Sequence, residues 1–309
     1  MDGILVRTAV PILFLMIAGY LSRRAGLLRP GDERVFSSYL YYFALPALFF
    51  VSVSESVFSP RTVLFVLAGI LPILVVLSIF ASLYVALRFS RDLFFVLTLS
   101  TVFGSLAFFG IPFVSFAYPG VGEPLAVFSS AFIAMLSVTL SLLFLELYRL
   151  ESRTRAAGLK HLAVRLSRNP LIISILAGIP FSLAGLKIPA PFSEPLHMLG
   201  STTNVVAIFM LGVFLYGRRY VRLSEAFKLS LLRIAFLPIL ALISVNLLGL
   251  TGIERSVLVI MHGTPMAISM MILSERYDFH KELMASVVLV SSVSATLSLN
   301  LWLLLLSSL

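Results

Sequence analysis

The sequence predicts an all-α polytopic membrane protein. Three features support this: a very apolar composition, apolar segments of membrane-spanning length, and basic residues concentrated in alternate loops. Of 309 residues, 60% are hydrophobic and 12% are Asp, Glu, Lys or Arg, about half the charged fraction of a soluble domain. Such a chain cannot cover itself with a surface that water wets. The composition therefore excludes an ordinary cytosolic enzyme, a nucleic-acid-binding domain and a disordered scaffold. The absence of cysteine excludes disulfides and thiolate metal sites.

Ten apolar segments can be delimited, most of them close to the roughly 20 residues that cross a bilayer as a helix. The first follows Asp2 rather than a basic region and has no small-residue cleavage site behind it. We therefore interpret it as a span and not as a cleavable signal. The ten segments are Ile4–Leu21, Val35–Ser54, Thr62–Leu87, Leu93–Tyr118, Pro124–Tyr148, Pro170–Leu186, Pro195–Tyr216, Leu229–Leu248, Glu254–Leu273 and Glu282–Leu306.

The loops between these segments are short, with one exception. The exception is the basic stretch Arg149–Asn169, which divides the chain into residues 1–148, a linker of residues 149–169, and residues 170–309. We expect each flanking part to contain five spans. Because short connections make successive spans antiparallel, the loops then alternate between the two sides of the membrane.

The basic residues are distributed unequally between the two sides. With alternating loops, Arg7, Arg61, Lys187 and Arg255 lie on one side, and the other 19 of the 23 Lys and Arg residues, Arg233 included, lie on the other. The positive-inside rule then places the linker in the cytoplasm and both termini on the extracytoplasmic side of the cell membrane. We interpret these arginines as topological anchors and lipid headgroup contacts rather than as ligands.

The two halves show internal similarity. Shifting the chain by 159 positions superimposes the first span on the sixth, with seven identities that include two glycines and two prolines. Since each half has an odd number of spans, the second half must insert upside down. Inverted repeats of this kind are typical of secondary transporters. A duplicated structural protein without transport activity is the alternative. The identities are Pro11/Pro170, Ala18/Ala177, Gly19/Gly178, Ala25/Ala184, Gly26/Gly185, Leu27/Leu186 and Pro30/Pro189.

The fourth and ninth segments each carry a Gly-x-Pro sequence, Gly110-Ile111-Pro112 and Gly263-Thr264-Pro265. Proline removes a backbone donor and clashes with the preceding turn, so we predict two broken helices near the middle of the membrane. Freed backbone groups at such a depth must face protein or water. The exposed helix N-termini would suit an anionic substrate group. A simple proline kink is the alternative for each helix.

Four polar residues near these breaks are candidate substrate ligands: Ser105, His262, Ser269 and Asn204. Each has a structural alternative, because serine usually bonds a carbonyl one turn back and asparagine often bonds a neighbouring helix. A titrating His262 would couple transport to protons, and a structural histidine is the alternative.

The sequence offers little for other chemistries. Ser105 and His262 are the residue types that a serine–histidine hydrolase needs. No nucleophile-elbow motif surrounds the serine, so we expect no enzyme activity. Histidines and acids form no metal-ligand cluster, and we expect no cofactor or metal. No carboxylate pair lies inside the spans for a sodium or proton site, although a sodium site of carbonyls and hydroxyls would leave no sequence signal.

The chain resembles the auxin efflux carrier family. The resemblance rests on Gly19-Tyr20-Leu21, on Leu45-Pro46-Ala47-Leu48, on Ser105–Pro112 and on the stretch from Pro265 to Tyr277, and it covers almost the full length. It implies ten spans in two inverted repeats and separate scaffold and transporter domains. It also implies crossed fourth and ninth helices beside which an organic anion binds, with transport by an elevator-like motion. The implied substrate site comprises Ser105, Gly110, Ile111, Pro112, Asn204, His262, Gly263, Thr264, Pro265 and Ser269.

This sequence departs from the family pattern where the asparagine before Gly-x-Pro is replaced by Ser105, and Ser269 is a similar replacement. These replacements argue against auxin itself, and the resemblance then implies the family's broader substrate class, a carboxylate such as malate. A sodium-coupled organic anion transporter of the bile-acid symporter type is the alternative. The expected partners are the small organic anion and membrane lipid, with no nucleic acid, and a homodimer is left open.

Overall fold

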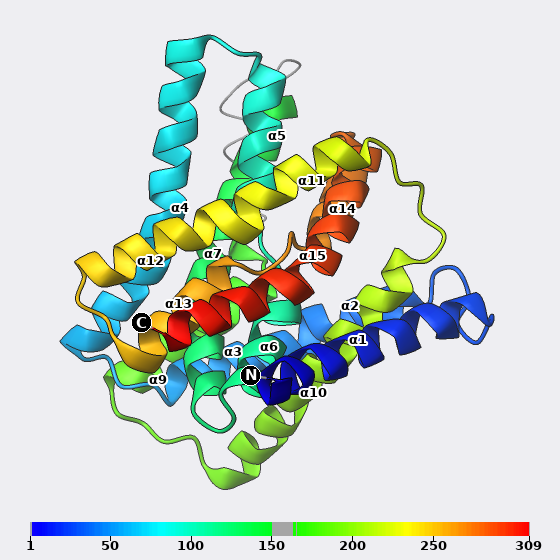
Figure 1. The fold of residues 1–309 in the computed structure, drawn as a ribbon. Coiled ribbons are helices and arrows are strands. Elements are labelled where there is room, and N and C mark those ends of the chain that lie inside the picture. Colours follow the sequence, from blue (N-terminus) through cyan, green and yellow to red (C-terminus); the bar gives the residue numbers. More distant parts are fainter. Residues whose placement is uncertain (1, 150–162, 165, 309) are drawn as a thin grey trace.

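The computed structural model describes residues 2–149, 163–164 and 166–308, and in these ranges the chain is helical with no β-strand beyond one isolated bridge (Figure 1). Among the described residues, three short π-helical turns, η1, η2 and η4, interrupt longer helices. In order, the elements are α1 Asp2–Arg24, α2 Glu33–Tyr39, η1 Leu40–Ala44, α3 Leu45–Ser54, α4 Pro60–Leu87, α5 Arg91–Val102, η2 Leu106–Gly110, α6 Ile111–Ala117, α7 Gly122–Arg149, α9 Pro170–Leu183, α10 Ala190–Leu215, α11 Leu223–Leu231, η4 Leu232–Phe236, α12 Leu237–Leu247, α13 Gly252–His262, α14 Ser269–Tyr277 and α15 Lys281–Ser307.

Each of the ten predicted segments falls on one helix or on two or three successive helical elements, so the all-helical fold is confirmed. Within the described ranges, seven helices are long and apolar enough to cross a bilayer. The remaining three segments differ: α9 has only 14 residues, and the fourth and ninth segments are each divided into two pieces. Fourteen helical residues rise about 21 Å, less than the roughly 30 Å of a hydrocarbon core. Most of the predicted linker 149–169 lies outside the described residues.

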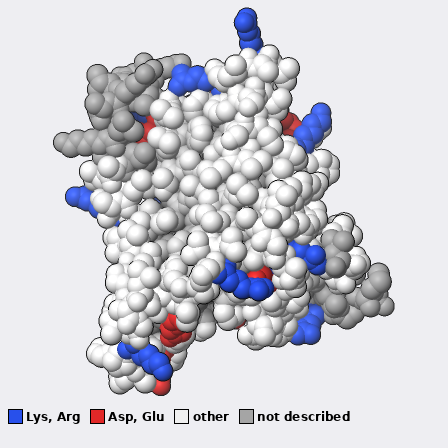
Figure 2. All heavy atoms as spheres, turned by 90° about the vertical axis from the view of Figure 1, so that its left-hand side faces the viewer, with Lys and Arg blue, Asp and Glu red and all other residues white. Residues whose placement is uncertain are grey.

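The outer surface of the molecule is apolar over a broad area. On the face shown in Figure 2, a broad central and upper area carries no charged side chain, and the Lys, Arg, Asp and Glu side chains lie at the top, at the sides and in a cluster below the centre. Phe14, Val85, Leu247 and Leu297 are each more than two-thirds exposed although they belong to long helices. Large exposed apolar patches are unstable in water. The surface therefore fits contact with lipid.

Close helix packing in one part of the fold depends on glycine. A Cβ on Gly19 of α1 would overlap the carbonyl oxygen of Phe209 in α10, and a Cβ on Gly212 of α10 would overlap the carbonyl oxygen of Met16. Small residues allow membrane helices to approach with their backbones in contact. In the same way, a Cβ on Gly178 of α9 would lie 3.0 Å from the carbonyl oxygen of Phe50 in α3.

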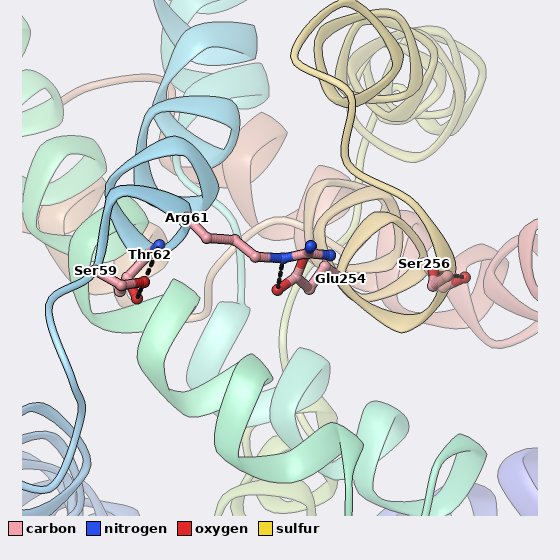
Figure 3. A network of polar contacts seen from close by, with 6 residues as sticks. Ser59, Arg61, Thr62, Glu254 and Ser256 are labelled. Atoms are coloured by element: carbon pink, nitrogen blue, oxygen red, sulfur yellow. Dashed lines mark hydrogen bonds and ion pairs between the residues drawn. The ribbon is translucent and has the colours of Figure 1, made fainter.

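The remaining long helices pack around α13, which is buried on most of its surface. Ser59 caps the N-terminus of α4 by accepting a hydrogen bond from the Thr62 amide at 3.1 Å (Figure 3). In the same view, Arg61 in the first turn of α4 forms an ion pair of 2.9 Å with Glu254 in the first turn of α13. This pair ties together the ends of two helices that are separated by almost 200 residues of sequence.

A proline follows each π-helical turn at the same distance. Pro46, Pro112 and Pro238 each stand two residues after the last residue of η1, η2 and η4, respectively. Proline cannot donate a backbone hydrogen bond, and its ring crowds the carbonyl four residues earlier in an α-helix. A wider π turn moves that carbonyl away and lets the helix continue. The sequence around these prolines therefore folds as a bulge rather than as a break.

Candidate functional site

Two helices are interrupted in the middle, and the interruptions lie against each other. Helix α5 ends at Val102 and helix resumes at Leu106, while α13 ends at His262 and α14 begins at Ser269. Gly104 and Met266 form an isolated antiparallel bridge between the two gaps. The Ser105 amide donates to the Pro265 carbonyl at 2.8 Å, and the Ala267 amide donates to the Phe103 carbonyl at 2.9 Å. Each interruption therefore satisfies backbone groups that the other leaves free.

The position of the first break corrects the prediction from Gly110-Ile111-Pro112. Those residues are helical: Gly110 ends η2, and Ile111 and Pro112 start α6. The actual gap is at Phe103–Ser105, because the π turn before Pro112 absorbs the proline without a break. In the ninth segment the prediction holds, since Gly263, Thr264 and Pro265 all lie in the gap.

A buried arginine connects the two gaps. Arg233, in η4, is fully buried and is the largest of the fully buried side chains among the described residues. Its Nε donates to the Thr264 carbonyl at 3.0 Å, its Nη2 donates to the Thr264 hydroxyl at 3.0 Å, and its Nη1 donates to the Thr101 carbonyl at 2.9 Å. No carboxylate in the described part of the chain forms an ion pair with it. We call the place where the gaps 103–105 and 263–268 meet the crossing. The crossing therefore carries a buried and uncompensated positive charge.

Gly104 makes room for this guanidinium. A Cβ added at Gly104 would overlap the Arg233 side chain, with Nε, Cζ and Nη2 as its three nearest atoms. On the other side, the indole of Trp302 in α15 donates to the Ile234 carbonyl at 3.0 Å, which holds the π turn in place beside Arg233. The arginine is thus positioned by a glycine in one gap and a tryptophan on the last helix.

Arg233 corrects the interpretation of the basic residues. The charge distribution predicts a topological anchor at this position, but the Arg233 side chain lies among helices and has no exposed surface. The π turn inserts an extra residue into the helix, which rotates the side chains that follow relative to a regular α-helix. Arg233 stands inside the apolar segment Leu229–Leu248, and an ionisable residue in a span interior is a signal of function that could have identified it.

Several predicted site residues do meet at the crossing. The Ser105 hydroxyl is buried without a hydrogen-bond partner, while the Ser105 carbonyl accepts from the Phe109 and Gly110 amides. Thr264 supplies two of the three oxygens that Arg233 contacts, and its hydroxyl also donates to the Met261 carbonyl at 2.8 Å. A Cβ on Gly110 would lie 2.8 Å from the Thr264 methyl carbon, so Gly110 packs on the second gap.

Other predicted residues lie in different surroundings. His262 is fully buried, and its Nε2 is 2.8 Å from the Gly69 carbonyl in α4, so this nitrogen carries the proton and donates. Its Nδ1 has no partner in the described part of the chain. Asn204 donates from Nδ2 to Glu123, at the start of α7, at 3.0 Å rather than to either gap. Ser269 begins α14 and is half-buried.

Among the described residues no group of three His, Asp, Glu or Cys side chains could hold a metal ion. A shallow groove is lined by seven residues of α4 alone, from Leu71 to Leu83. Its apolar wall and single-helix lining fit a lipid tail on the outer surface better than a charged substrate. The crossing with Arg233 is therefore the candidate site.

Comparison with known proteins identifies the family of the chain. The family model described as "Membrane transport protein" matches residues 4–303. The chain is 22% identical to the uncharacterized transporter YfdV of Escherichia coli (strain K12), over 95% of each chain. It is also 22% identical to the uncharacterized transporter MJ1031 of Methanocaldococcus jannaschii, over 98% of this chain and 97% of the relative. With an apolar helical fold, two paired helix interruptions and a family match over nearly its whole length, the chain belongs to the membrane transport protein family that includes the auxin efflux carriers.

Proposed function

We propose that the protein is a secondary transporter that carries a small organic anion, a carboxylate, across the cell membrane by an elevator-type alternating-access motion. The observation that carries this proposal is the pairing of two interrupted helices around the uncompensated charge of Arg233. As a carrier it would move its substrate unchanged, without a catalytic residue or a cofactor.

The charge at the crossing favours an anionic substrate. A guanidinium has five N–H donors, and three of those of Arg233 are used by Thr101 and Thr264. A buried charge is costly unless it is paired, and a carboxylate is the partner that fits a guanidinium best. The unpartnered Ser105 hydroxyl, next in sequence to Gly104, supplies a further donor for a carboxylate oxygen. The site is therefore complementary to a small carboxylate.

Two structural correspondences support the inverted repeat. After α1, the Ala25, Gly26 and Leu27 amides donate to the Leu21, Arg23 and Ser22 carbonyls. After α9, the same three bonds recur 159 residues later, ending at Leu186, and Gly26 and Gly185 both have positive φ. Moreover, the first helix of each half packs on the second segment of the other half, α1 on α10 and α9 on α3. We accordingly propose ten spans in two inverted five-span repeats, crossed at the paired gaps.

The elevator motion requires two parts that slide past each other. We assign α1, α2, α3, α9 and α10 to a scaffold, and the helices that surround the crossing to a moving domain. Asn204 with Glu123 and Arg218 with Glu275 are polar contacts that join the two parts, at 3.0 and 2.6 Å. Both pairs are partly exposed, so breaking them during the motion costs little.

The proposed orientation places both termini outside the cytoplasm. It rests on the excess of Lys and Arg in alternate loops. A reporter that matures only in the cytoplasm, fused after Leu309, should stay inactive, whereas the same reporter inserted in the linker of residues 149–169 should be active. Activity at Leu309 would overturn this topology.

The function is tested by ligand-induced thermal stabilisation of the purified protein, followed by flux into proteoliposomes. Mono- and dicarboxylates are compared with their uncharged amides, with and without sodium. A ligand at a hundred times its Kd stabilises the folded state by about 2.7 kcal/mol, which is a measurable shift in Tm. We expect a saturable shift with at least one carboxylate, none with the matched amide, and flux of the same carboxylate. Shifts with no carboxylate, or equal shifts with the amides, would refute an organic anion carrier.

A sodium-coupled organic anion carrier is the second candidate. The carbonyl oxygens of Thr101 and Thr264 beside the two gaps favour it, because unwound backbone and half-helix C-termini hold sodium in many secondary transporters. Steep activation of flux by sodium in the same assay would support this candidate over the first.

A further inference from the structure

The oxygens around Arg233 have a common origin in the ends of broken helices. Thr101 is in the last turn of α5, where backbone carbonyls have no helical partner. Thr264 lies two residues beyond the end of α13, in the second gap. These positions supply two carbonyl oxygens and one hydroxyl oxygen, all between 2.9 and 3.0 Å from a guanidinium nitrogen.

Such a set of oxygens is the kind that binds an alkali cation. Carbonyl oxygens at half-helix C-termini carry partial negative charge, and in secondary transporters they coordinate sodium at unwound segments. In this protein the guanidinium of Arg233, which comes from η4, donates to these oxygens instead. Gly104 has no side chain and so leaves the space that the guanidinium fills. The oxygens at the crossing therefore form a cation-binding site, and the guanidinium of Arg233 occupies it.

We propose that Arg233 is a built-in cation that takes the place of a coupling sodium ion at the helix crossing, so that the protein folds and binds its anion without sodium. In a sodium symporter the positive charge enters and leaves with the substrate. In this protein the charge remains when the anion leaves, so a sodium gradient supplies no driving force through this site. The part of the inference that concerns transport rests on the proposed function, and the part that concerns the cation site does not.

The first test needs no variant. The Tm of the purified wild-type protein is measured in sodium chloride and in choline chloride of equal concentration. We expect the same Tm in both salts, because the site is already filled. A rise in Tm that saturates with sodium and is absent with choline would overturn the inference.

The second test empties the site and refills it. Arg233→Ala removes the cation and leaves three buried oxygens without a donor. We expect the Tm to fall by about 5–10 °C, and millimolar guanidinium chloride to recover most of that loss. Arg219→Ala, which removes an exposed arginine, is the matched control and should show neither the loss nor the recovery. A folded Arg233→Ala protein with wild-type Tm, or one that no cation stabilises, would overturn the inference.

A second pair of variants decides the case if Arg233→Ala does not fold. Arg233→Lys keeps a charge, whereas Arg233→Met keeps much of the side-chain volume without charge. We expect the lysine variant to be clearly more stable than the methionine variant. Equal stability, or a more stable methionine variant, would show that the cation is not what the crossing requires.

Failure of the transport proposal is recognised separately. If no carboxylate binds to the wild-type protein while guanidinium still restores Arg233→Ala, the organic anion function is wrong and the built-in cation stands. If carboxylates bind only when sodium is present, the organic anion function stands and the built-in cation is wrong.

Discussion

Gly104 and Arg233 are in direct contact across two segments, and no other residue type fits at position 104 without displacing the guanidinium. The glycine lies in the gap after α5 and the arginine in the π turn before α12. Glycine is therefore required here for the space that its missing Cβ leaves and not for an unusual backbone angle, since Gly104 is not among the glycines with positive φ.

Gly104→Ala should displace Arg233 and leave the carbonyls of Thr101 and Thr264 without their donor. We expect a loss of roughly 3–5 kcal/mol in stability and of substrate binding, because a buried charge would lose its partners. Gly263→Ala is the control in the other gap, since its Cβ would meet mainly the movable end of Leu299, at 2.9 Å. Thermal unfolding in detergent measures both variants. Equal Tm values for the two would contradict the importance of the Gly104–Arg233 contact.

Pro265→Ala and Pro112→Ala should reduce transport flux to different extents. Both replacements should impair turnover more than folding, but Pro265 lies within a gap, where its carbonyl accepts from Ser105, and Pro112 lies in a continuous helix. Alanine at 112 restores a donor that can straighten the π turn, whereas alanine at 265 adds an amide to the crossing itself. We expect the larger loss of flux for Pro265→Ala in proteoliposomes. Wild-type flux in both variants would contradict a role for the interruptions.

Gly19→Ala and Gly212→Ala should each force α1 and α10 apart. In both cases the added methyl group would overlap a backbone carbonyl, which cannot move without the helix. We expect losses of a few kcal/mol, of the kind that overpacking produces. Gly200→Ala is a milder control, because its nearest atoms belong to Leu48 at 3.1–3.2 Å. A Tm for Gly19→Ala that is no lower than that of Gly200→Ala would show that α1 and α10 can move apart without a loss of stability.

His262→Gln should preserve both folding and flux, since a glutamine amide can also donate to the Gly69 carbonyl. His262→Leu lacks a donor and should cost roughly 1 kcal/mol of stability. The comparison separates a structural histidine from one that takes part in transport. A His262→Gln protein with normal Tm but no flux would show that the imidazole itself is needed.

Tyr220 should make stability sensitive to alkaline pH. It lies in the loop after α10, where burial raises the pKa of its phenol to about 12 and its hydroxyl donates to the Leu215 carbonyl at 2.6 Å. A raised pKa means that the folded state favours the neutral phenol, so its contribution is complete below pH 10 and is lost as the pH rises toward 12. Tyr220→Phe should flatten this alkaline decline in Tm. If the Tm of Tyr220→Phe falls with alkaline pH as steeply as that of the wild type, other titrating groups cause the decline.

The sequence alone determined the environment and the approximate layout of the protein. Its apolar composition required a membrane, because no soluble fold could hide so much apolar surface, and its ten apolar segments each coincide with one or more of the observed helical elements. The gap at Gly263-Thr264-Pro265 was also readable from residue types, whereas a crossing that includes Ser105 and Thr264 was implied only by the family resemblance. These features depend on local propensity and on hydrophobicity, which act over short stretches of chain.

The tertiary structure decided what lies at the centre of the crossing. Whether a proline breaks a helix or is absorbed by a π turn depends on the neighbours that satisfy the freed backbone groups, and at Pro112 and Pro238 the helix continues. Whether Arg233 anchors the protein at the membrane surface or stabilises the crossing depends on where that π turn directs its side chain. Its partners lie 31 and 132 residues away along the chain. Hydrogen bonds over such separations exist only after the helices have packed, so residue order alone does not specify them.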